Sequence, residues 1–95
     1  MLCVGKAAFY REVCAEIIHL LQKERTRRRL SKYAVSKQSG VSQSMLSLVE
    51  RGLRNPTLEI MLRIADGIGA DLPTLIKKAT SSVSKRESLS SKDNS

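Results

Sequence analysis

The feature that most constrains this chain is a glycine-centred turn between two short helical segments. Residues 32–39 and 43–51 each have the pattern of a short helix, and Gly40-Val41-Ser42 separates them. Ser31 and Ser42 precede the two segments, where a hydroxyl can accept a hydrogen bond from the first helical turn. Gly40 can take the positive φ that ends a helix. The sequence therefore predicts two helices that cross at a sharp angle.

Helical periodicity predicts three further helices around this pair. Apolar residues at helical spacing predict a first helix over residues 7–28. Thr57 is expected to cap a helix at 58–68, and Asp71 a short last helix that ends near Lys78. Residues 80–95 hold too few apolar side chains to bury, so we expect them to be disordered. No strand pattern appears, and the expected fold is an all-α, five-helix domain over residues 1–79.

Most of the positive charge of the chain lies around the turn. Residues 23–54 hold nine Lys or Arg residues against two acidic ones, a net +7 of the +8 that the whole chain carries. A pI near 10 indicates a polyanionic partner, either a nucleic acid or an anionic membrane surface. Only Phe9, Tyr10 and Tyr33 are aromatic, which excludes the stacking platforms that bind single strands or RNA. A compact helix pair in a local cationic field is what a DNA-reading element needs.

The sequence offers little chemistry for catalysis or for a cofactor. Cys3, Cys14 and His19 match no zinc pattern and are one ligand short, and the histidine is expected to be a partly buried helix residue. No carboxylate pair, phosphate-binding glycine loop or cysteine nucleophile context appears. We therefore expect no enzyme, no metal and no cofactor. The two cysteines form no disulfide framework, and neither a signal peptide nor a membrane span is evident, which favours a cytoplasmic protein.

A series of short motifs runs from the start of the helix pair to the last expected helix. They are Leu30-Ser31, Gly40-Val41-Ser42-Gln43, Leu46, Val49, Glu50-Arg51-Gly52, Asn55-Pro56-Thr57 and Leu75. In this order and spacing they resemble the helix-turn-helix domain of the phage repressor and Cro type, the XRE family, over residues 25–76. The resemblance implies a five-helix repressor-like domain that binds double-stranded DNA in a sequence-specific way. A transcriptional regulator, and specifically a repressor, is the expected role.

We expect this regulator to bind DNA as a homodimer. One recognition helix covers only a few base pairs, so two should read an inverted-repeat operator. The last helix, with Leu72 and Ile76, and the segment Met1–Val4 are the candidate contact surfaces because they are more apolar than one small domain needs. The same domain also serves antitoxins and restriction-modification controllers. An alternative of another class is a basic helical module in which Lys23–Arg29 bind a protein or a membrane.

The expected DNA-binding residues surround the second helix of the pair. Helical spacing places Gln43, Ser47 and Arg51 on one solvent face. Glutamine suits an adenine edge, serine suits several bases, and arginine suits guanine or phosphate. The resemblance also places Leu48 at the groove, where it either touches a thymine methyl or covers the core. The full expected set is Lys32, Ser42, Gln43, Ser44, Ser47, Arg51, Arg54 and Asn55. For Arg54 and Asn55 a purely structural role in the loop is the alternative.

The resemblance also implies an ion pair that is structural and not a DNA contact. Family members commonly pair a glutamate at the position of Glu50 with an arginine at that of Arg25. Arg27 and Arg28 are then expected to remain in solvent. The alternative is a solvent-exposed Glu50 that pairs with Arg54 or with no residue. Arg29 stands where most members have glycine, and a left-handed conformation there costs about 1–2 kcal/mol.

Overall fold

The computed structural model describes residues 2–94, with side chains described for residues 8–86. Across residues 2–94 it consists of helices and turns without a strand. The five helices are α1 (Leu2–Arg27), α2 (Lys32–Ser39), α3 (Gln43–Glu50), α4 (Leu58–Ile68) and α5 (Leu72–Asn94). The expected all-α, five-helix fold is therefore confirmed.

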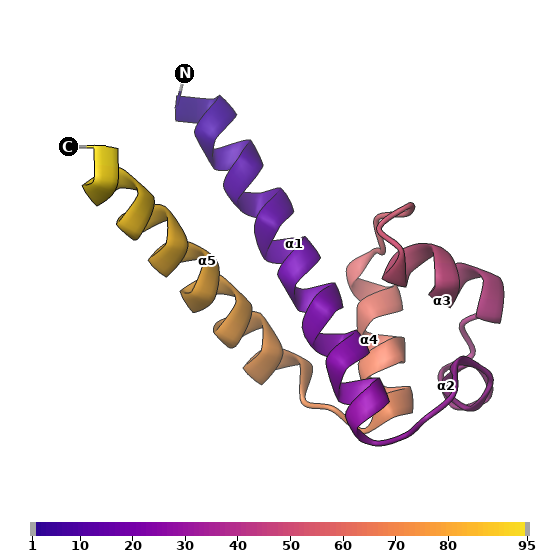
Figure 1. Cartoon of the computed structure of the whole chain (residues 1–95). Helices are drawn as coiled ribbons and strands as arrows, with labels where there is room; N and C mark the ends of the chain where they lie inside the picture. The colour runs from indigo at the N-terminus through magenta and orange to yellow at the C-terminus, as the bar shows by residue number, and fades with distance from the viewer. Residues whose placement is uncertain (1, 95) are drawn as a thin grey trace.

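The two long helices pack together and the three short ones gather at one end of them (Figure 1). α1 and α5 lie side by side and run in opposite directions (Figure 1). α2 packs on α4, and α3 contacts both α1 and α2. Among the described residues, the α2–α3 pair therefore makes no contact with α5 and follows directly on the C-terminal end of α1, where residues 23–29 carry many of the cations.

Local signals fix the ends of the short helices as the sequence predicts. The hydroxyls of Ser31, Ser42 and Thr57 accept hydrogen bonds from the backbone N–H three residues on, at 3.0, 3.1 and 3.2 Å. Gly40 ends α2 at φ 76°, in the left-handed region where a side chain is unfavourable. α2 and α3 are thereby held to eight residues each, with the sharp turn between them.

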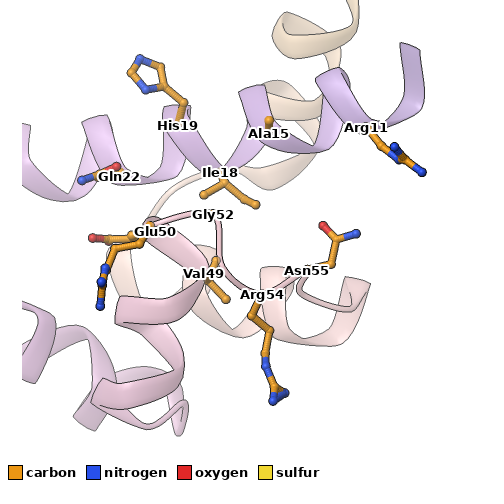
Figure 2. A pocket seen from close by; sticks show the side chains of 11 residues that line it. Arg11, Ala15, Ile18, His19, Gln22, Val49, Glu50, Gly52, Arg54 and Asn55 are labelled. Carbon is orange, nitrogen blue, oxygen red and sulfur yellow. The ribbon is translucent and has the colours of Figure 1, made fainter. Parts of the chain in front are cut away.

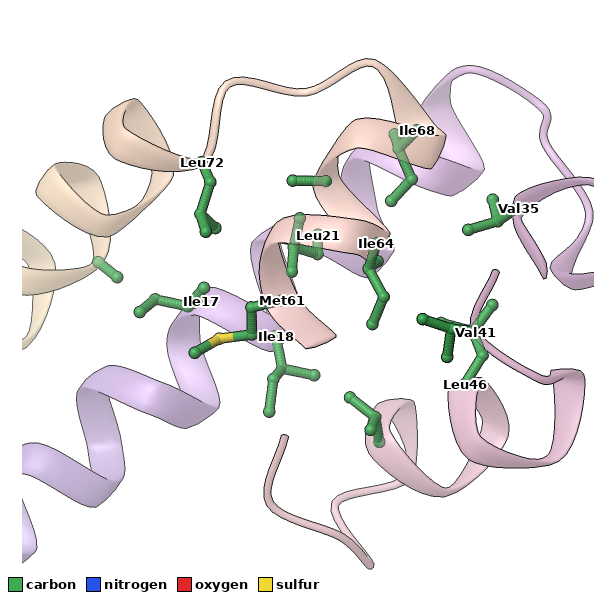
Figure 3. Packing of buried hydrophobic residues seen from close by; sticks show 13 residues of the cluster. Ile17, Ile18, Leu21, Val35, Val41, Leu46, Met61, Ile64, Ile68 and Leu72 are labelled. Carbon is green, nitrogen blue, oxygen red and sulfur yellow. The ribbon is translucent and has the colours of Figure 1, made fainter. Parts of the chain in front are cut away.

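An aliphatic core joins all five helices and fixes the angle between α2 and α3 (Figure 3). Its members are Ile17, Ile18, Leu21, Val35, Val41, Leu46, Val49, Met61, Ile64, Ala65, Ile68, Leu72 and Ala79. Val35 of α2 and Leu46 of α3 are almost completely inaccessible to solvent. Leu72, which the sequence made a candidate for a dimer surface, instead lies in this core, because α5 begins directly against α4.

A close approach between α2 and α4 depends on Gly67. A Cβ atom at this position would lie 2.9 Å from Cβ of Ser39 and 3.2 Å from the carbonyl oxygen of Val35. Ser39 is buried there, and its hydroxyl accepts a hydrogen bond from the Val41 backbone N–H at 3.1 Å. The small residues Gly67 and Ser39 therefore allow α2 and α4 to pack closely, and this close packing fixes the position of the α2–α3 pair on α4.

The last helix is longer than the sequence predicts. α5 does not end near Lys78 but continues to Asn94, and no break separates residues 80–94 from the rest of the helix. Ala79 and Val83, one helical turn apart, are completely buried on the helix that packs on α1. One buried apolar side chain per turn is enough to hold this part of α5 on α1, because α1 is long enough to cover these side chains. Ser95 lies outside the described residues.

The first helix also differs from the prediction at both ends. α1 begins at Leu2 and not near residue 7, and it ends at Arg27. Arg29 follows it at φ 59°, the left-handed conformation expected at this position. The side chains of Met1–Val4 lie outside the described residues. Within the described part of the chain, no helix combines the length and the apolar character needed to cross a bilayer.

The packing of α5 on α1 predicts a large difference between two neighbouring aspartate substitutions. Val83→Asp would place a carboxylate in a site without solvent, whereas Ser82→Asp adds the same charge at an exposed position of the same turn. We expect Val83→Asp to lower the free energy of unfolding by roughly 2–4 kcal/mol and Ser82→Asp by less than about 0.5 kcal/mol. Chemical denaturation of both variants measures this. Equal stabilities would show that α5 is not packed beyond residue 79.

Candidate nucleic-acid interface

The exposed face of α3 is a shallow depression lined by polar side chains. Gln43, Ser44 and Arg51 are exposed, while Ser47 and Leu48 are half-buried, and together they line it. The opposite face of α3 carries the buried Leu46 and Val49. The apolar stripe of α3 is therefore used by the core, and the remaining stripe is open to a ligand. Leu48 lies at the border between the buried face and the exposed face.

The first turn of α2 adjoins this face of α3. Nζ of Lys32 donates a hydrogen bond to the hydroxyl of Ser47 at 3.3 Å. The N-terminus of a helix attracts anions, because its first backbone N–H groups have no partner within the helix. A cation and a helix N-terminus thus lie beside the small side chains that would approach a base pair.

The remaining candidates cap α3 or follow it. Ser42 is exposed, and its hydroxyl holds the first turn of α3, although a hydroxyl that accepts one bond can still donate its proton. Arg51, Arg54 and Asn55 are all exposed in the connection between α3 and α4. With part of α1 they line a second hollow, which adjoins the first because Arg51 contributes to both. The eight candidate residues therefore lie on α3, at the residue that caps it, at the start of α2 or in the connection that follows α3.

A bidentate ion pair fixes the C-terminal end of α3 against α1. The Arg25 guanidinium donates from Nε and Nη2 to the two carboxylate oxygens of Glu50, at 2.7 and 3.0 Å. Its Nη1 donates to the carbonyl oxygen of Leu30 at 2.8 Å. The side chains of Arg25 and Glu50 are only 11% and 6% exposed. The pair expected from the sequence is thus present, and Glu50 faces inward instead of pairing with Arg54.

Two other arginines at the end of α1 are less free than the sequence suggested. Nη1 of Arg28 donates to the carbonyl oxygens of Ile68 and Gly69, at 3.0 and 2.9 Å, and so caps the C-terminal end of α4. Arg28 is exposed, as expected, but sequence reasoning missed this additional contact because Arg28 and the end of α4 are far apart in the sequence. Arg27 remains exposed but pairs with Glu24.

The Glu24 carboxylate reduces the cationic field at the end of α1. Arg27 donates to both its oxygens, at 2.8 and 2.5 Å. This hydrogen bond, with the charges of Arg27 and Arg28, lowers the pKa of Glu24 from 4.5 to about 2, and it raises the pKa of Arg27. A carboxyl whose pKa is lowered in the folded state stabilises the fold above its unfolded pKa. The contribution is therefore present above pH 4.5, is lost as the pH falls towards 2, and is small for an exposed pair.

Two of the three candidate metal ligands, Cys14 and His19, have described side chains. Cys14 is half-buried, with its thiol free, and Cys3 lies outside the described side chains. His19 is exposed and not partly buried as expected, because it points away from the core side of α1, and it lines the hollow beside the α3–α4 connection. Among the side chains of residues 8–86, no group of three possible ligands could hold a metal ion.

Comparison with known protein families agrees with this geometry. A helix-turn-helix family model matches residues 21–75, which is more than half of the chain. The chain belongs to the XRE family of helix-turn-helix proteins. It therefore carries a DNA-binding domain of the transcription-regulator type. Neither a search of curated proteins nor one of solved structures gives a significant match.

In this XRE-family protein the Arg25–Glu50 pair predicts an unequal effect of two glutamate substitutions. Glu50→Ala would leave Arg25 buried without its partner, which costs about 3–5 kcal/mol when the site is fully buried and less at partial exposure. Glu59→Ala is the matched control, because Glu59 pairs with Arg63 at 2.9 Å in an exposed position. We expect the control to lose less than about 1 kcal/mol. Urea denaturation measures both, and equal losses would contradict a structural role of the buried pair.

Proposed function

We propose that this protein is a sequence-specific transcriptional regulator, a repressor, that reads the major groove of double-stranded DNA with α3. The observation that supports this most strongly is the division of α3 into two faces. One face is anchored by the core and the Arg25–Glu50 pair, and the other exposes Gln43, Ser44, Ser47 and Arg51. A rigid helix with small polar side chains at its N-terminal end suits direct reading of base edges.

The positions of the other candidates suggest a division of labour. Gln43 and the two serines would contact base edges, Gln43 as a bidentate partner of adenine. Lys32 with the start of α2, and Arg54 with Asn55 after α3, lie on either side of this face and would hold phosphates. Contacts to the backbone on both sides would fix the angle at which α3 enters the groove.

A homodimer is part of the proposal, with a contact surface that differs from the one expected from the sequence. α3 spans eight residues, too few to specify a long site alone. Leu53, Leu58 and Leu62 are about half or more exposed, in the α3–α4 connection and on α4. Leu58 and Leu62 lie one helical turn apart on α4, and Leu53 lies in the connection that leads from α3, so we propose these exposed leucines as the contact with a second copy. The two α3 helices of such a dimer would stand about 34 Å apart.

The alternative roles differ in how far the structure supports them. An antitoxin or a restriction-modification controller would use the same interface, and binding to DNA does not separate them from a repressor. A membrane-binding module needs exposed apolar residues beside its cations. The apolar side chains of α1 next to the basic end, Ile17, Ile18 and Leu21, are buried in the core. The DNA-binding role therefore has the stronger support.

Titration of the protein with a mixed-sequence duplex at increasing salt tests the proposal. Binding to phosphates releases counterions, so log K should fall with log salt with a slope of about 0.9 for each phosphate contact. Vesicles that contain anionic lipid serve as the control and should bind more weakly. Tight binding to the vesicles with none to the duplex would favour the membrane module instead.

Two substitutions should separate base reading from phosphate binding. Gln43→Ala should cost about 1–3 kcal/mol of preference at one base position and leave binding to random duplexes nearly intact. Arg51→Ala should weaken binding to all sequences to a similar extent. Affinities for a selected site and for its single-base variants measure both effects. An unaltered site preference in Gln43→Ala would remove Gln43 from the set of base-reading residues.

A further inference from the structure

We propose that Arg11, in the N-terminal half of α1, extends the DNA-binding surface as a further contact to the phosphate backbone. This inference rests on the proposed function, and it adds a residue that lies outside the segment matched by the family model. The contact would be made in the hollow between α1 and the connection that follows α3.

The hollow has an apolar floor and a polar rim (Figure 2). Ile18 of α1 and Val49 of α3 are buried between its two sides. Arg11 lies on one side and Asn55 with Arg54 on the other, and the volume enclosed is about 280 Å³. The rim therefore offers charged and amide donors from two separate parts of the chain.

The charge of this hollow favours an anion. Arg11, Arg51 and Arg54 are among its lining residues, and Glu50 is the carboxylate among them. That carboxylate is already neutralised by the bidentate contact with Arg25. Glu12 follows Arg11 in the sequence, but neighbouring residues of a helix point about 100° apart. Three arginines thus border the hollow, and the one carboxylate among its lining residues is already paired with Arg25.

The spread of these arginines favours the DNA backbone over a small anion. Arg11 lies on α1 and the Arg54 side chain extends away from α1, so these two cations are spread apart and are not gathered at one point (Figure 2). Arg51 also lines the depression on α3 that would face the bases. A duplex seated on α3 would carry its phosphates past Arg51, and duplex DNA presents a charge about every 1.7 Å. Arg11 is placed to meet the next part of the strand.

The test compares Arg11→Ala with Lys78→Ala. Both remove one positive charge from an exposed position, but Lys78 lies on α5 and lines a different hollow. We expect Arg11→Ala to reduce the salt slope for duplex binding by about 0.9, the value for one lost phosphate contact, and Lys78→Ala to leave the slope unchanged. Phosphate-ethylation interference should lose one position per half-site in Arg11→Ala. Base preference should be unaltered, and Arg11→Lys should retain most of the slope.

The possible results separate the Arg11 contact from the proposed DNA-binding function. If the parent binds duplexes and Arg11→Ala has the slope and interference pattern of Lys78→Ala, this inference is wrong and the proposed function stands. If the parent binds no duplex, both fail. A free phosphate ion could bind the hollow in place of a DNA phosphate. Thermal unfolding with inorganic phosphate, in the absence of DNA, tests this alternative. Stabilisation of the parent but not of Arg11→Ala, with an unchanged DNA slope, would assign the hollow to a free phosphate and overturn the contact to DNA.

Discussion

The position of the recognition surface depends on how α3 is fixed to α1. The core contacts of Leu46 and Val49 hold α3 near the rest of the domain, but aliphatic contacts tolerate small shifts more readily than a bidentate ion pair does. Arg25 and Glu50 supply that directional contact, and the bond from Arg25 to the Leu30 carbonyl also fixes the chain as it leaves α1. The pair thus connects the long helix, the start of α2 and the end of α3.

The second constraint is the close contact of α2 with α4. Gly67 allows Ser39 to approach, and Val35 lies directly beside this contact. α4 in turn is capped by Arg28 from the end of α1. α3 and α4 are therefore held to α1 by polar contacts as well as by the core. In a domain of this size the core is small, and such polar contacts fix the relative positions of the helices more closely than the core alone would.

The sequence predicted best what is decided locally. The caps at Ser31, Ser42 and Thr57 and the turn at Gly40 depend on residues a few positions apart, and each lies where expected. The resemblance to a family added the Arg25–Glu50 pair, which no local pattern shows. For the expected DNA-binding residues, the structure gives their positions and exposure, and their roles stay predictions.

The errors concern features that depend on distant partners. Composition predicted disorder after residue 79, because Val83 is isolated in a polar sequence, yet it is buried on the side of α5 that packs on α1. The cap that the exposed Arg28 makes on the end of α4 was missed, because the two are distant in the sequence. Arg11, Ala15 and His19 do share helical spacing, so a periodic signal for the hollow was present in the sequence. Its meaning depends on the opposite wall, which is formed by residues after α3.

Selection of bound sites from a pool of random duplexes tests the central claim most directly, that paired α3 helices read a DNA sequence. The account predicts enrichment of a two-fold symmetric site whose half-sites lie about one helical turn apart. The Gln43→Ala variant should enrich a site altered at one position in each half. Retention of duplexes by charge alone, with no sequence enriched over successive rounds, would contradict the assignment of α3 as a reading helix.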